Sequence, residues 1–318
     1  MKMKNVKSLI CLAVCVMGSA LHAQSTNPIE LVSDKLKLKW EKQDDGWHLT
    51  EAAAKSETGW LALPSPSGRY TVIYINRNPS KQLTEVDREG LAYPFFPSDV
   101  EKQSDGKLVF KQKLPFGELT AEWSLDPKYP SNAHVNLSLK MTEKGSVSIA
   151  SPTLGVFSED SIGWGMVPGN WYGSDVQPNF ELSPTYSQGL PNRAYLAQEK
   201  NSMTLCPLIS TKSGLTLGVI PDPECANDPW ESKESTRDVW KLGLSTMDRY
   251  GQLTPVIYRP VLGQAGWLMS PARQFSLDID TRCKRRRGFR SFDMRPRTFI
   301  DSPICLTFRH RKSRYPIA

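Results

Sequence analysis

The chain has 318 residues, of which 39% are hydrophobic and 23% are charged, and its formal net charge is +7. The positive excess lies at the two ends, with three Lys in residues 1–23 and twelve Lys or Arg against two Asp in residues 282–318, which leaves 25 basic and 31 acidic side chains, a net charge of −6, in residues 24–281. A nucleic-acid-binding domain needs a basic face, so this acidic body argues against nucleic acid as a partner.

The N-terminus has the three parts of a secretory signal peptide. A basic stretch at residues 2–7 precedes a short apolar run at 9–17, and small residues at 20–23 provide a cleavage site. The apolar run is much shorter than the roughly 20 residues that a membrane-spanning helix needs. We therefore expect a signal peptide over residues 1–23, a mature start at Gln24, and export to the periplasm or the extracellular space without a transmembrane segment.

Apolar and polar residues alternate with the period of a β-strand in most of the body. In 119–125, for example, Leu119, Ala121 and Trp123 alternate with Thr120 and Glu122. Turn-forming Gly, Pro, Asn and Asp separate such runs. The candidate strands are 35–40, 69–75, 107–113, 119–125, 135–141, 146–150, 203–209, 214–220, 238–244, 254–261 and 273–279.

This pattern predicts an all-β fold, namely one large antiparallel β-sandwich over residues 24–281. No series of helices alternates with the strands to supply parallel crossovers. The sequence EAAAK at 51–55 is the one helical signal, equivalent to one or two turns. No repeat of fixed length indicates a propeller or a solenoid.

Residues 282–318 form an irregular basic tail with no alternation. A basic arm is the ordinary interpretation of such a run, but the tail also contains Phe, Ile and Cys, which solvated arms usually lack. The alternative is that the chain leaves its original reading frame near residue 282, so that the tail is out of frame or disordered.

The cysteines and histidines of residues 24–281 give little evidence of catalytic or metal-binding chemistry. Cys206 and Cys225 can form a disulfide in an oxidising compartment or remain ordinary thiols. His48 and His134 are the histidines of the body, and two cannot build a three-histidine metal site, so we expect both to be structural, with no metal and no cofactor. The motifs GxSxG, HExxH and CxxC are absent, and the catalytic residues stay unknown.

The stretch 162–195, which begins IGWGMVPGNWYGSD, is the densest aromatic and glycine region of the chain. It contains five Gly and four Pro and shows no strand pattern, and loops of such length are uncommon in compact domains and usually functional. Aromatic rings stack on the apolar faces of sugars, and polar groups bind their hydroxyls. The predicted carbohydrate-binding residues are Trp164, Asn170, Trp171, Tyr172, Asp175, Tyr186, Asn192 and Arg193. The alternative is that these aromatics cap the sandwich or pack against a neighbouring domain.

The order of a signal peptide, a sandwich over residues 28–281 and the loop WGMVPGNWYG followed by GLPNRAY resembles the N-terminal domain of large secreted bacterial glycoside hydrolases. The resemblance implies a mutarotase-like supersandwich, followed in the full-length parent by an (α/α)6 helical barrel that carries the catalytic carboxylates. This chain lacks such a barrel. The resemblance therefore implies a truncated piece, whose face toward the missing barrel would be a large apolar patch.

Three functions follow from these features. The first is an accessory sandwich of a polysaccharide-degrading glycoside hydrolase, truncated and catalytically incomplete. The second is a self-contained periplasmic or surface carbohydrate-binding module, and both functions take an oligo- or polysaccharide as partner. The third, an independent epimerase or lyase, would need a His or Tyr base in a cleft and has little support in the sequence.

Overall fold

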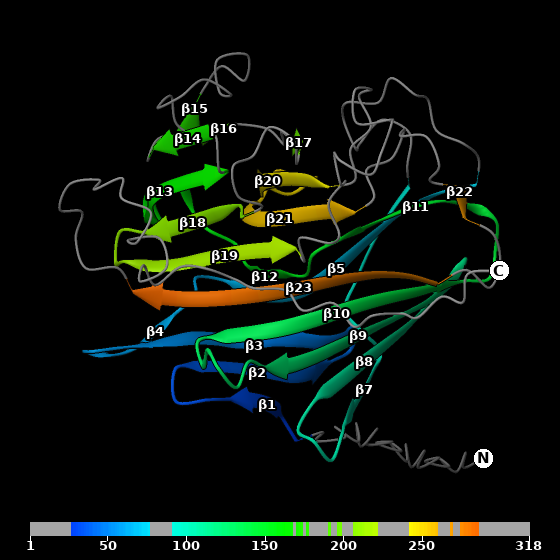
Figure 1. The fold of residues 1–318 in the computed structure, drawn as a ribbon, viewed down its shortest axis with the longest axis horizontal. Coiled ribbons are helices and arrows are strands. Elements are labelled where there is room, and N and C mark those ends of the chain that lie inside the picture. Colours follow the sequence, from blue (N-terminus) through cyan, green and yellow to red (C-terminus); the bar gives the residue numbers. More distant parts are fainter. Residues whose placement is uncertain are drawn as a thin grey trace, which may run out of the picture.

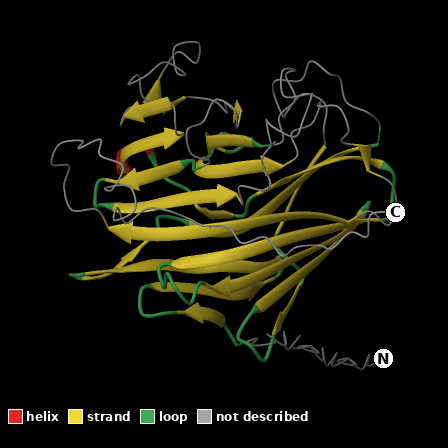
Figure 2. Cartoon of the chain, in the orientation of Figure 1, coloured by secondary structure: helices red, strands yellow, loops and turns green. Residues whose placement is uncertain are grey.

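A computed structural model describes residues 27–76, 91–167, 170–173, 176–177, 190–191, 196–198, 206–221, 242–259, 268–269 and 274–285. In these residues the one helical element is the short 3-10 turn η1 (Glu159–Ser161), and all other regular structure is strand (Figure 2). No helix within these ranges is long and apolar enough to cross a membrane.

The strands form three large sheets and one short pair (Figure 1). The four-stranded sheet has the order β1 (Ile29–Val32), β2 (Leu36–Gln43), β3 (Gly46–Ser56) and β4 (Gly59–Ala62). The nine-stranded sheet has the order β14 (Asn170–Gly173), β13 (Ile162–Val167), β18 (Leu208–Thr211), β19 (Leu215–Pro221), β23 (Gln274–Arg285), β10 (Asn132–Met141), β9 (Gly117–Leu125), β8 (Leu108–Leu114) and β7 (Asp99–Lys102).

The eight-stranded sheet follows the order β12 (Thr153–Gly155), β5 (Pro66–Ile75), β11 (Gly145–Ala150), β21 (Leu253–Arg259), β20 (Gly243–Met247) and β17 (Ala197–Gln198), with β6 (Leu91–Phe95) beside β5 and β22 (Leu268–Met269) beside β11. The short parallel pair is β15 (Val176–Gln177) with β16 (Leu190–Pro191). The strand pairs in the three large sheets are antiparallel, for example β9 with β10 and β10 with β23. The predicted all-β, antiparallel sandwich is therefore confirmed.

The three large sheets enclose one core. Strand β3 packs against β5 and β23, while β18 and β19 pack against β21, so each sheet contacts strands of another. Alternation determines which side chains enter the core: on β9, Leu119, Ala121 and Trp123 are buried, whereas Glu118 and Glu122 are exposed. The predicted strands over 119–125 and 135–141 are confirmed for the same reason.

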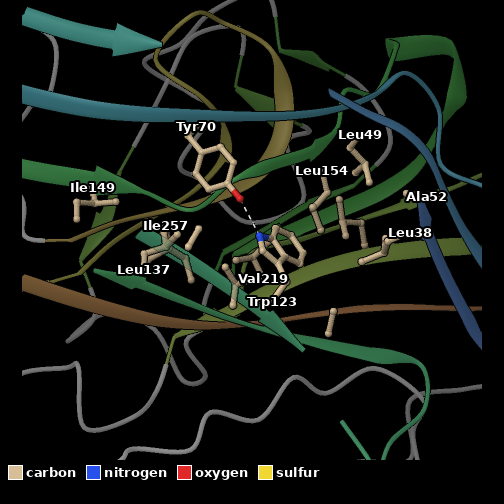
Figure 3. Close-up of a cluster of buried hydrophobic side chains, with 14 of the residues drawn as sticks. Leu38, Leu49, Ala52, Tyr70, Trp123, Leu137, Ile149, Leu154, Val219 and Ile257 are labelled. Carbon is tan, nitrogen blue, oxygen red and sulfur yellow. Dashed lines mark hydrogen bonds between the residues drawn. The ribbon is translucent and has the colours of Figure 1, made fainter. Parts of the chain in front are cut away.

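Trp123 lies where the three sheets meet (Figure 3). Its indole N–H donates a hydrogen bond of 2.7 Å to the hydroxyl of Tyr70 on β5, and both residues are buried. The ring of Trp40, from β2, contacts the edge of the Trp123 ring at a centroid distance of 5.3 Å. Burial raises the pKa of Tyr70 well above its usual value, which keeps the hydroxyl protonated. The donor and acceptor at the centre of the apolar core thus satisfy each other.

The helix predicted at 51–55 is wrong, because these residues belong to β3. Ala52, Ala53 and Ala54 are buried, and β3 is hydrogen-bonded on both sides, to β2 and to β4. The helical propensity of Ala, Glu and Lys is worth only fractions of a kcal/mol per residue, about 0–0.7, and is outweighed by burial and sheet pairing.

The last strand runs past the predicted start of the tail at residue 282. β23 continues to Arg285, where Arg285 pairs with Leu215 of β19 and Cys283 pairs with Leu217. Residues 282–285 therefore belong to a central strand of the nine-stranded sheet, and the rest of the tail lies outside the described residues. The Cys206–Cys225 disulfide stays a prediction, because Cys225 also lies outside them.

The large apolar face expected for a truncated domain is not found in the described ranges. The eight-stranded sheet is buried on its outer face as well, where Ile73, Ala150, Val256 and Tyr258 form a second cluster with Leu196 packed against it. The exposed large apolar side chains of the described residues lie singly on different turns and strands, and they are Val32, Trp60, Leu91, Tyr129 and Tyr250.

The Tyr70→Phe substitution tests the buried hydrogen bond without changing the packed volume. It removes the acceptor and leaves the Trp123 N–H buried without a partner, so we expect the free energy of unfolding to fall by about 1–3 kcal/mol. Denaturant unfolding measures this change. Val32→Ala, at an exposed side chain of β1, serves as the control and should change it by less than about 0.5 kcal/mol. Equal stability of Tyr70→Phe and the parent chain would contradict the assigned role of the bond.

Candidate functional site

The predicted aromatic loop is partly a β-hairpin at the edge of the nine-stranded sheet. Strand β13 pairs with β18 on one side and with β14 on the other, so β14 is the outermost strand of the sheet order. The prediction that 162–195 contains no strand is therefore wrong. The strand pattern of β13 is not visible in the sequence, because two register shifts interrupt its alternation of buried and exposed residues. One shift lies between Ile162 and Trp164 and the other between Gly165 and Met166.

The two ends of β13 are buried in the core, and Trp164 and Met166 between them are half-buried. Ile162 and Val167 are fully buried in the main core, whereas Trp164 and Met166 are only partly buried. Anchoring residues on either side of Trp164 fix the backbone that carries the indole. An aromatic side chain on a fixed strand is positioned more precisely than one on a free loop.

Four of the eight predicted carbohydrate-binding residues lie on this hairpin. Trp164 is on β13, while Asn170, Trp171 and Tyr172 are on β14, where the register places Trp171 opposite Met166 and Asn170 opposite Val167. The structure therefore brings the backbones of these four residues together at one sheet edge.

The other four predicted residues, Asp175, Tyr186, Asn192 and Arg193, lie outside the described residues, and their role stays a prediction. The neighbouring pair β15 and β16 joins Val176 to Leu190, and β16 also contacts β14. Segments on either side of residues 178–189 thus come together next to the hairpin.

Sequence analysis missed a charged cluster on the eight-stranded sheet. The guanidinium of Arg69, at the start of β5, donates hydrogen bonds to the carboxylate of Asp248 and, at 2.6 Å, to Oε1 of Gln252. Asp248 and Gln252 flank the tight turn between β20 and β21, which carries Gly251 in the left-handed region at φ +76°. The partners are 179 residues apart in sequence, so no local signal could have revealed the pair.

Tyr250 covers this cluster. Its ring centroid is 4.6 Å from the guanidinium carbon of Arg69, and the residue is 42% exposed. Asp248 itself is buried, and its Oδ1 accepts the backbone N–H groups of Tyr250 at 2.8 Å and Gln252 at 2.9 Å. Burial raises the pKa of Asp248, against the opposing effect of these N–H groups and of Arg69. Burial also raises the pKa of Tyr250.

The chemistry open to this cluster is limited because its carboxylate is fully engaged. Both oxygens of Asp248 have protein partners, which makes the Arg69–Asp248 pair a structural clasp between β5 and the β20–β21 turn. The partly exposed Tyr250 ring is left as a surface that can pack against a ligand.

Histidines and carboxylates elsewhere in the described residues have structural surroundings. Nε2 of His48 lies 2.6 Å from Asp45 and its ring stacks on Phe96, while Nε2 of His134 lies 3.1 Å from Asp126. The two buried carboxylates of the described residues, Asp126 and Asp248, are on separate turns. Each is held by hydrogen bonds within its own turn, whereas glycoside hydrolysis needs two carboxyl groups that face each other across the bond. The same residues contain no group of three or more His, Cys, Asp or Glu that could hold a metal ion.

No protein-family model and no curated protein matches the sequence. Several solved structures share its fold. A polysaccharide lyase has 10% identity and a TM-score of 0.38 over 81% of this chain and 34% of the lyase. A GalM/aldose epimerase homologue from C. elegans has 9% identity and a TM-score of 0.47 over 82% of this chain and 99% of that one. The α-N-acetylgalactosaminidase NagBb from Bifidobacterium bifidum has 7% identity and a TM-score of 0.38 over 81% of this chain and 36% of the enzyme.

A glycosidase and an epimerase homologue are among them, as the sequence resemblance implies, together with a polysaccharide lyase, and the chain spans about a third of the lyase and of the galactosaminidase. Their identities are all below 25% and their TM-scores below 0.5, so the function is argued from the geometry of the chain itself.

The Arg69–Asp248 clasp makes a stability prediction. Arg69→Met leaves the buried Asp248 carboxylate without its cation and should lower the free energy of unfolding by about 2–4 kcal/mol. Adding Asp248→Asn removes the uncompensated charge while keeping an oxygen for the two backbone N–H groups, so the double variant should recover part of the loss. Urea unfolding of Arg69→Met, Asp248→Asn and the double variant measures this. A double variant whose loss of stability equals or exceeds the sum of the two single losses would contradict the pairing.

Proposed function

We propose that the sandwich binds an oligo- or polysaccharide at the β13–β14 hairpin and acts as the accessory domain of an exported polysaccharide-degrading glycoside hydrolase. The observation that carries the proposal is the half-buried Trp164 on a strand anchored at both ends, with Asn170, Trp171 and Tyr172 on the paired strand. This edge combines aromatic residues with an amide, the two kinds of group that sugar binding requires.

The position of the hairpin at the sheet edge also favours sugar binding. β14 ends the order of the nine-stranded sheet, so one side of its backbone faces away from β13. Backbone N–H and C=O groups on the unpaired side of an outer strand can serve hydroxyls as donors and acceptors. An aromatic ring beside such groups can bind a pyranose, because the ring packs on the apolar face of the sugar while the backbone groups bind its hydroxyls.

An accessory role fits the chain better than an independent enzyme. The buried carboxylates of the described residues are separated and engaged by protein partners, and each of the two body histidines already contacts a carboxylate. We therefore place the catalytic carboxylates in a helical domain of a longer parent protein. The self-contained carbohydrate-binding module uses the same hairpin and differs only in having no such parent.

Binding to a panel of oligosaccharides, measured by isothermal titration, tests the hairpin site. Trp164→Ala should weaken binding about fivefold or more, because stacking of a sugar on an indole contributes on the order of 1–3 kcal/mol, by analogy with base–aromatic stacking. Trp164→Phe keeps a ring and should retain most of the affinity. Leu91→Ala, at an exposed residue of β6, is the surface control and should bind as the parent chain does.

Two results would overturn the hairpin site. One is an unchanged affinity in Trp164→Ala, and the other is a loss of affinity in both Trp164→Ala and Trp164→Phe that is accompanied by a lowered melting temperature in both. Either result would leave the aromatics as packing residues, which was the alternative open from the sequence.

The encoding DNA separates the accessory domain from the self-contained module. A continuation in another frame that encodes a helical, acidic and Trp-rich domain supports the truncated accessory domain. Absence of such a continuation in every frame supports the module. Export is tested separately by N-terminal sequencing of protein recovered outside the cytoplasm, which should begin at Gln24 if the proposed signal peptide is cleaved.

A further inference from the structure

Four segments at one end of the sandwich lie together, the left end in Figure 1. They are the β1–β2 turn at 33–35, the β3–β4 hairpin at 55–60, the β9–β10 turn at 126–131 and the end of β23 at 282–285. Hydrogen bonds join them: the Ser33 hydroxyl donates to the carbonyl of Pro130, and the Lys55 N–H donates to the carbonyl of Lys35 at 2.9 Å. Asn132 pairs with Arg282 in the β10–β23 register. We call these four segments the basic end.

Two exposed aromatic residues at the basic end each carry a lysine ammonium above the ring. The Lys55 ammonium is 5.9 Å from the centroid of Trp60, which is 44% exposed. The Lys128 ammonium is 5.1 Å from the centroid of Tyr129, which is 39% exposed. The same combination of exposed ring and cation thus occurs twice, once at the β3–β4 hairpin of the four-stranded sheet and once at the β9–β10 turn of the nine-stranded sheet.

The charge at the basic end is mostly positive. Lys35, Lys55 and Lys128 are exposed, and β23 adds the backbone positions of Arg282, Lys284 and Arg285. Asp34 and Glu57 are the exposed acids in the first three segments. Asp126 is buried and occupied: its Oδ1 accepts the backbone N–H groups of residues 128 and 129, and its Oδ2 lies 3.1 Å from His134. The basic end therefore contrasts with the acidic body of the chain.

We propose that the basic end is a second carbohydrate-binding surface, which takes an anionic polysaccharide such as a uronate or sulfated chain. A pyranose ring can stack on Trp60 or Tyr129, and its carboxylate or sulfate can then accept hydrogen bonds from Lys55 or Lys128. Acidic sugars are favoured over nucleic acid because the surface combines only a few cations with two separated ring platforms, whereas the rest of the body is acidic. The surface is distinct from the β13–β14 hairpin.

Titration of the full chain with polygalacturonate, and with an uncharged glucan as the contrast, tests this surface. We expect binding of polygalacturonate that weakens as NaCl rises from about 50 to about 300 mM. Lys55→Gln with Lys128→Gln should weaken it about tenfold through the loss of two charge-assisted contacts. Trp60→Ala with Tyr129→Ala should weaken it comparably at both salt concentrations, because stacking is not screened.

The matched control is Lys113→Gln with Lys140→Gln. Both lysines are exposed, and they lie near the C-terminal ends of β8 and β10, where each pairs with Glu118 of β9. This double variant therefore removes two positive charges, as Lys55→Gln with Lys128→Gln does, without changing the basic end. It should bind polygalacturonate as the parent chain does. Equal weakening by the control would show that only net charge matters and would overturn the proposal.

Two further outcomes would overturn it. One is no binding of polygalacturonate at low salt, and the other is duplex DNA binding with the same affinity and the same sensitivity to Lys55→Gln with Lys128→Gln. Trp164→Ala should leave polygalacturonate binding unchanged while reducing binding at the hairpin, so the two carbohydrate surfaces can fail independently.

Discussion

The hydrogen bond from the Trp123 indole to the Tyr70 hydroxyl joins the nine-stranded sheet to the eight-stranded sheet at the centre of the core. Trp40, from the four-stranded sheet, packs on the edge of the same indole, so one side chain is shared by all three layers. Because an unpaired polar group in such a core is costly, this hydrogen bond favours one orientation of the two large sheets relative to each other. The β13–β14 hairpin and the β20–β21 turn belong to these two sheets, so their relative position follows from that orientation.

The β13–β14 hairpin shows how the core supports the proposed surface site. Ile162 and Val167 enter the core at the two ends of β13, while Trp164, which lies between two register shifts, is only half-buried. The Arg69–Asp248 clasp does the equivalent for the β20–β21 turn, where it supports the exposed ring of Tyr250. In both places the aromatic surface is held by groups beneath it, as a preorganised binding surface requires.

The parts of the fold that could be predicted are those where side-chain alternation was uninterrupted. β9 and β10 keep a strict period of two because one face enters the core and the other meets solvent. Ala52, Ala53 and Ala54 are buried on both faces of β3, so this part of the strand shows no alternation of apolar and polar residues. Its composition favoured a helix. β13 was hidden by its register shifts and its glycines. The Arg69–Asp248 pair depends on long-range topology, and no local pattern in the sequence encodes it.

The most direct test of a glycan site on this scaffold is an NMR titration of the tryptophan indole N–H signals with an oligosaccharide that binds. The chain has nine Trp, and the Trp164→Phe spectrum assigns the signal of interest. The account predicts that the Trp164 signal shifts on titration while the Trp123 signal, locked on Tyr70 in the core, does not. A bound sugar that leaves Trp164 unmoved, or that shifts Trp123 instead, would contradict it.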